Sequence, residues 1–184
     1  MTDDLLHGGA LDRMQSAYPS APPPWIDLST GINPWPYPVG TLPAAGWQHL
    51  PTEAAMQACC AAMASAIGAP ESALLLAPGS ELLIRLLPTV IAPRTVALAS
   101  PTYGDHARAW RASGAEVIET ADPLAEAGKV DALVLCNPNN PTGIVLERSQ
   151  LGQALTRQAA RNGRLIVDEA YADLSPALSL APLA

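Results

Sequence analysis

Short apolar runs alternate with helical patterns along the chain from residue 52 onward. Strands are predicted where four or five consecutive residues are mostly apolar, over 73–77, 95–99, 116–119, 131–135 and 164–168. Helices are predicted between them, over 79–91, 104–114 and 147–163. Because these strands are apolar on both faces, the pattern predicts an α/β fold: a mostly parallel sheet flanked by helices.

The part of the chain before this alternation has a different character. An Ala-rich helix is predicted over 54–68, with Thr52 as its N-cap and Gly68 at its end. Residues 19–51 are rich in proline and glycine, which indicates an extended, irregular arm. We therefore expect an N-terminal arm over 1–51 and a sheet domain over 52–184.

The composition argues against several kinds of binding partner. The 184 residues carry a net charge of −7, which argues against a nucleic-acid or anionic-membrane surface. No apolar segment is long enough to span a bilayer and no signal peptide is recognised, so a cytoplasmic protein is predicted. The cysteines (Cys59, Cys60 and Cys136) and the histidines (His7, His49 and His106) lack metal-ligand spacing, so no metal site is predicted.

Unusual segments follow four of the predicted strands. They are APGSE (77–81), SPTYGDH (100–106), CNPNNPTG (136–143) and DEAYADL (168–174). Ligands of open α/β sheets bind at the carboxyl ends of the strands, so these segments are expected to share one edge. Taken singly, each stays open: Ser80 could cap a helix or bind phosphate, Tyr103 could plug the sheet edge or stack on a ring, and Asp168 could form a salt bridge or hold a ring nitrogen.

Together, and in this order, the four segments resemble the fold-type-I pyridoxal-phosphate (PLP) enzymes of the class I/II aminotransferase family, with NPNNPTG as the most specific motif. The resemblance implies that PLP is the cofactor. Gly79, Ser80 and Glu81 would cradle its phosphate, and Tyr103 would stack on its ring. Asn140 and Tyr171 would bind the ring hydroxyl oxygen, and Asp168 would pair with the pyridine nitrogen.

The N-terminal arm is similar to one branch of this family. LHGG (6–9) and WIDLSTGINPWPYP (25–38) resemble the threonine-phosphate decarboxylases of cobalamin biosynthesis. The resemblance implies a phosphorylated amino acid as substrate, a homodimer, and substrate contacts from His7, Gly8, Gly31, Asn33 and Asn140. For His7 a loose chain terminus is the alternative. A histidinol-phosphate-type aminotransferase and a non-catalytic remnant of the fold remain alternatives for the function.

One departure from the family pattern concerns the lysine that binds PLP as a Schiff base. The family carries it in a motif such as S-[FL]-[GT]-K, followed by G-x-R-x-G, and neither motif occurs here. The single lysine, Lys129, precedes the 131–135 strand, whereas the expected site lies after that strand. The resemblance therefore covers about the first half of the family's length, and we predict an N-terminal portion with no catalytic lysine, no activity alone and weak PLP binding.

Overall fold

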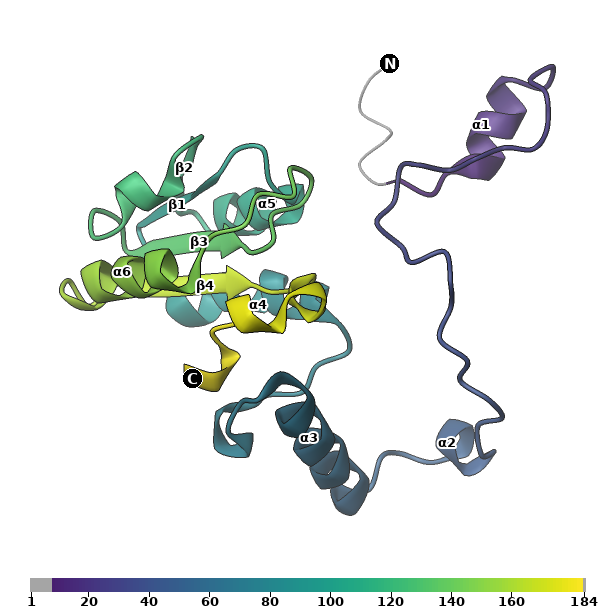
Figure 1. Cartoon of the computed structure of the whole chain (residues 1–184), viewed down its shortest axis with the longest axis horizontal. Helices are drawn as coiled ribbons and strands as arrows, with labels where there is room; N and C mark the ends of the chain where they lie inside the picture. The colour runs from purple at the N-terminus through teal and green to yellow at the C-terminus, as the bar shows by residue number, and fades with distance from the viewer. Residues whose placement is uncertain (1–7, 184) are drawn as a thin grey trace. The chain divides into compact units, whose positions relative to one another are not determined.

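The computed structural model describes residues 8–183, and these fall into two compact units, Met1–Leu50 and Pro51–Ala184 (Figure 1). The second unit contains a four-stranded sheet. Its strands are β1 (Thr95–Ala99), β2 (Glu116–Thr120), β3 (Ala132–Cys136) and β4 (Arg164–Asp168). They lie in the order β2-β1-β3-β4 and every neighbouring pair is parallel, which confirms the predicted parallel sheet.

Helices cover both faces of this sheet (Figure 1). They are α4 (Ser80–Ile91), α5 (Gly104–Ala112) and α6 (Arg148–Ala159). On one face, Val96 and Val134 pack against Trp110 of α5 and against partly buried apolar residues of α4. On the other face, Leu133 packs against Leu151 of α6. Alternate strand residues point to opposite faces, so strands with a helical layer on each side must be apolar throughout.

The Ala-rich helix forms as α3 (Glu53–Ile67). Its N-cap is Thr52, whose hydroxyl accepts a hydrogen bond from the Ala55 N–H at 3.2 Å. Gly68 ends it in the left-handed conformation, with φ of 74°. Of its fifteen residues, Ala64 is the one that is buried. Local capping therefore defines the ends of this helix, whereas the sheet core contributes little to it.

The predicted strand over 73–77 is wrong. Ala73 ends a short 3₁₀ turn, η1 (Glu71–Ala73), and Leu74 is extended with φ of −99° and ψ of 137°. Within the described residues no strand pairs with this segment, and Leu75 is 77% exposed. An apolar run becomes a strand only where a neighbouring strand accepts and donates its backbone hydrogen bonds.

Three further 3₁₀ turns follow β4, and one precedes β3. They are η2 (Pro123–Glu126), η3 (Ala172–Leu174), η4 (Pro176–Leu178) and η5 (Ala181–Leu183). No helix within residues 8–183 combines the length and apolar character that crossing a membrane requires.

In the Met1–Leu50 unit, residues 8–50 form two short helices, α1 (Leu11–Ala17) and α2 (Ala45–Gln48), joined by irregular chain. Side-chain turns shape it locally. The Asp27 carboxylate accepts hydrogen bonds from the Ser29 N–H and hydroxyl, and Asn33 accepts one from the Trp35 N–H. None of residues 8–50 is buried.

Candidate cofactor site

The candidate site lies where the strand order reverses. After β1 the chain moves outward to β2 and then returns to β3 on the opposite side of β1. The loops that follow β1 and β3 therefore diverge and leave a crevice, which is the usual ligand site of open α/β sheets. A cavity of about 230 Å³ occupies this region. Its lining includes six of the residues predicted from the sequence: Ser80, Glu81, Tyr103, Asn140, Asp168 and Tyr171.

The three asparagines of the NPNNPTG loop have different surroundings. Asn137 forms two hydrogen bonds with the Leu146 backbone, donating to its carbonyl at 3.1 Å and accepting from its N–H at 2.8 Å. Asn139 donates to the Pro101 carbonyl and the Thr142 hydroxyl, and accepts from the Thr102 hydroxyl at 2.7 Å. Asn140 makes no side-chain hydrogen bond within the described chain, and it lines the cavity. Two asparagines thus hold the loop, while the third has an amide available to a ligand.

The start of α4 forms another part of the wall. Gly79 precedes the helix with φ of 89°, a backbone conformation that residues with a Cβ rarely adopt. Since glycine has no side chain to cap the helix, the first N–H groups of α4 keep hydrogen-bonding capacity toward a ligand. Ser80, exposed and on the cavity wall, adds a hydroxyl. Such a helix start suits a phosphate group.

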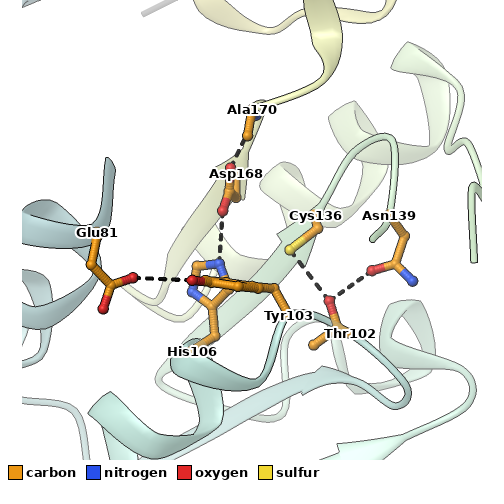
Figure 2. Close-up of polar contacts among 8 residues, drawn as sticks. All are labelled: Glu81, Thr102, Tyr103, His106, Cys136, Asn139, Asp168 and Ala170. Carbon is orange, nitrogen blue, oxygen red and sulfur yellow. Dashed lines mark hydrogen bonds and ion pairs between the residues drawn. The ribbon is translucent and has the colours of Figure 1, made fainter. Parts of the chain in front are cut away.

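Asp168 is the charged group at the end of β4 (Figure 2). One carboxylate oxygen lies 2.9 Å from Nε2 of His106, and the other accepts a hydrogen bond from the Ala170 N–H at 3.0 Å. The hydrogen bond from His106 lowers the pKa of Asp168 more than partial burial raises it. Burial disfavours charged His106, yet its hydrogen bonds to Asp168 and Cys136 raise its pKa to about 9. At neutral pH the pair is therefore an imidazolium and a carboxylate.

Tyr103 extends from the loop after β1 into the cavity. Its hydroxyl donates to Glu81 at 3.4 Å, and its ring meets the His106 ring edge-on with centroids 6.2 Å apart (Figure 2). Burial raises the pKa of Tyr103, and the carboxylates of Asp105 and Glu81 raise it further. The phenol stays neutral. The Glu81 carboxylate also pairs with Arg85 at 2.6 Å.

Two residues of this site were missed from the sequence. His106 and Cys136 are both buried, and both lie against Asp168. The separation in sequence hides this cluster, since His106 and Asp168 are 62 residues apart. A signal existed for His106, because the third residue after Tyr103 falls in the first turn of α5, at the same edge of the sheet.

The predicted substrate-binding residues of the N-terminal arm, and Lys129, belong to other parts of the chain. His7 is outside the described residues, and Gly8, Gly31 and Asn33 belong to the Met1–Leu50 unit. Lys129 precedes β3, at the end of the strand opposite Asn140, and its amine pairs with Glu126 at 3.4 Å. Its position is therefore unlike that of a lysine at the carboxyl end of the sheet.

Comparison with known proteins identifies the family. The family description for class I and II aminotransferases matches residues 43–182. The chain belongs to the class I and II aminotransferase family. Within this family, it is 38% identical over 182 residues to a threonine-phosphate decarboxylase of Sinorhizobium sp, covering 98% of this chain and 55% of that protein. A histidinol-phosphate aminotransferase of Desulfitobacterium hafniense is 31% identical over 178 residues, covering 83% of this chain and 48% of that protein.

Solved structures share the fold. The histidinol-phosphate aminotransferase of Clostridium acetobutylicum aligns with a TM-score of 0.59 and 17% identity, over 71% of this chain and 42% of that one. The chain spans about half the length of the curated relatives that it matches. The aminotransferase-family sheet is thus present, and the relatives contain further residues beyond the region matched here.

Proposed function

We propose that this chain supplies the PLP-binding half of the active site of an enzyme that acts on a phosphorylated amino acid. The observation that carries the proposal is the cavity at the strand switch point. Three groups meet there. They are the partly buried Asp168 carboxylate, which His106 holds, the start of α4, which no side chain caps, and the Asn140 amide, which has no hydrogen-bond partner among the described residues. These groups match a cationic ring nitrogen, a phosphate and a ring oxygen, the three polar features of PLP.

The donor set fits this cofactor in charge as well as in position. Asp168 is a carboxylate at neutral pH and can accept from a protonated pyridine nitrogen. His106 holds that carboxylate from the protein side, so the orientation of Asp168 does not depend on the ligand. Ser80 and the first N–H groups of α4 would bind the phosphate. Asn140 and Tyr171 would hold the ring oxygen, and Tyr103 would cover the ring face.

Bound PLP acts as an electron sink for a bond broken at the substrate Cα. The residues of this chain would act by binding and orienting. Asp168 would hold the proton on the ring nitrogen, and Tyr103 would exclude water from one ring face. The Tyr103 phenol donates to Glu81 and has a raised pKa, so it stays neutral and is unsuited to act as a base.

Decarboxylation of L-threonine O-3-phosphate is the reaction we favour. The support is the 38% identity to threonine-phosphate decarboxylases of Sinorhizobium sp and Pseudomonas aeruginosa over nearly the whole chain. Transamination of histidinol phosphate is the second candidate, favoured by the 31% identity to the Desulfitobacterium aminotransferase. If the reaction is the decarboxylation, Gly8, Gly31 and Asn33 would contact the substrate.

Cofactor binding tests the first part of the proposal. Titration of the purified chain with PLP, followed by the change in PLP absorbance, is expected to show weak saturable binding. Asp168→Asn should weaken it about tenfold or more, because the charge opposite the ring nitrogen is lost. Glu116→Gln, a control on an exposed residue at the opposite end of the sheet, should leave it unchanged. Equal affinities for the two variants would contradict the assignment of Asp168.

The reaction is tested on the protein expressed from its complete gene. That protein is expected to release carbon dioxide from L-threonine O-3-phosphate. Amino transfer from histidinol phosphate to 2-oxoglutarate is measured in parallel. Turnover in the second assay alone would replace the decarboxylase by the aminotransferase, and turnover in neither would favour a non-catalytic protein.

A further inference from the structure

Three side chains with metal-binding atoms meet beside the cavity. A ring nitrogen of His106, the Sγ of Cys136 and a carboxylate oxygen of Asp168 all lie within 4.8 Å of one another. They come from three separate elements, the first turn of α5 and the last residues of β3 and β4 (Figure 2). The sequence predicts no metal because the spacing between these residues follows no ligand motif, and only the sheet brings them together.

The scaffold holds these three groups firmly. Cys136 and Asp168 are direct partners in the β3–β4 register, so their separation is determined by strand pairing. His106 is 3% exposed, and the helix that carries it is anchored in the core by Trp110, which is 1% exposed. A ligand set on rigid elements loses little conformational entropy when it binds an ion.

The mixture of donors selects among metal ions. A thiolate, an imidazole and a carboxylate suit Zn²⁺, whereas Mg²⁺ and Ca²⁺ prefer oxygen ligands alone. Tetrahedral zinc with ligands at about 2.0–2.3 Å places ligand atoms about 3.3–3.7 Å apart. The His106 and Asp168 atoms lie 2.9 Å apart and must separate slightly on binding, and the three ligand atoms lie within 4.8 Å of one another. The adjoining cavity of about 230 Å³ leaves space for water as a fourth ligand.

We propose that this cluster, when the adjoining cavity is free of PLP, binds Zn²⁺ through His106, Cys136 and Asp168. On binding, the thiol proton of Cys136 and the proton between His106 and Asp168 pass to solvent, and the ion takes their place. The binding stands independently of the proposed function, because it requires no cofactor.

Cobalt substitution tests the site on the purified chain after removal of metal and PLP. Titration with Co²⁺ is expected to give a thiolate-to-cobalt charge-transfer band in the near ultraviolet and intense visible bands of tetrahedral cobalt. One equivalent of Zn²⁺ should abolish both. Cys136→Ser should remove the charge-transfer band and lower Zn²⁺ affinity more than about tenfold. The double variant Cys59→Ser, Cys60→Ser, which removes the two thiols of α3, should keep both signals.

X-ray absorption at the zinc edge of the unaltered chain gives a second readout that does not depend on the folding of a variant. The expected result is one sulfur ligand at about 2.3 Å and nitrogen or oxygen ligands at about 2.0 Å. Absence of a sulfur ligand would overturn the proposal. So would a charge-transfer band that persists in Cys136→Ser and disappears in the Cys59/Cys60 variant.

Discussion

Apolar side chains are exposed to solvent in residues 8–50 and buried in the central sheet. In the first region Leu28 is 89% exposed and Trp35 is 80% exposed. In β3, by contrast, all five residues are buried, and Leu133 is fully so. Both regions contain aliphatic residues, so composition alone does not account for the difference.

The difference follows from what shapes each backbone. Residues 8–50 are shaped by prolines and by side-chain turns such as that of Asp27 with Ser29, which need no neighbouring element. The sheet needs strands far apart in sequence and helical layers on both faces. Burial is the main favourable contribution to folding, so we expect the free energy of unfolding to come almost wholly from the sheet unit. Residues 8–50 keep a local shape and contribute little to it.

The largest expected effect comes from a cavity in the sheet core. Leu133→Ala should lower the free energy of unfolding by about 2–5 kcal/mol, since it removes buried methyl groups between β3 and α6. Urea unfolding followed by far-ultraviolet circular dichroism measures this. The matched control is Leu28→Ala, expected to change the value by less than about 0.5 kcal/mol. Similar losses for both variants would show that residues 8–50 share the core.

A smaller loss of stability is expected for one of two neighbouring asparagines, Asn139, than for Leu133. Asn139→Ala should cost about 1–3 kcal/mol of unfolding free energy, because it removes the hydrogen bonds of this side chain to the Pro101 carbonyl and to the Thr102 and Thr142 hydroxyls. Asn140→Ala should leave stability nearly unchanged while weakening PLP binding in the absorbance titration. If Asn140→Ala proved the more destabilising variant, the assignment of Asn139 to holding the loop and of Asn140 to binding the ligand would be wrong.

The two regions should also differ in their response to acid. Hydrogen bonds from the Thr95 and Arg94 N–H groups lower the pKa of Asp131 below its usual value of 3.8. Its stabilising effect is therefore present above that value and is lost as pH falls through the lowered pKa. Because the side chain is 42% exposed, Asp131→Asn should cost no more than about 1 kcal/mol at neutral pH.

Asp27 provides the contrast within residues 8–50. Hydrogen bonds from Ser29 lower its pKa as well, but the residue lies in 8–50, where no residue is buried. Its protonation should open the local turn without moving the unfolding midpoint. Asp27→Asn is therefore expected to keep the acid dependence of unfolding, whereas Asp131→Asn should flatten it. A flattened dependence in the Asp27 variant would contradict the assignment.

The smallest effect on global stability is expected at Gly8. A Cβ on this residue would lie 2.0 Å from the Ser29 carbonyl oxygen, so Gly8→Ala must displace the local backbone. The amide signals of Gly9 and Ser29 should shift in NMR spectra, since the Gly9 N–H donates to the Ser29 hydroxyl. The free energy of unfolding should change by less than about 0.5 kcal/mol. Gly40→Ala, where a Cβ meets no atom within 4 Å but φ is 66°, offers a comparison between contact and backbone strain.

Much of the sheet unit was predictable from local pattern. Apolar runs marked β1, β2, β3 and β4 within a residue or two, and Thr52 and Gly68 marked the ends of α3. These features depend on periodicity and capping, which act over a few residues. The run over 73–77 has the same apolar character but forms no strand, since it lacks a paired neighbour.

The candidate site likewise has residues that the sequence predicted and residues that only the structure revealed. Asp168, Asn140, Tyr103 and Ser80 were identified because each follows a predicted strand and belongs to a motif of the family. The sequence by itself therefore determined which residues stand at the strand ends. Only the tertiary structure decided that His106 and Cys136 flank Asp168, and that Asn139 holds the loop while Asn140 lines the cavity. The physical reason is that strand pairing and helix packing bring together residues 30 or more positions apart, and no local periodicity records those contacts.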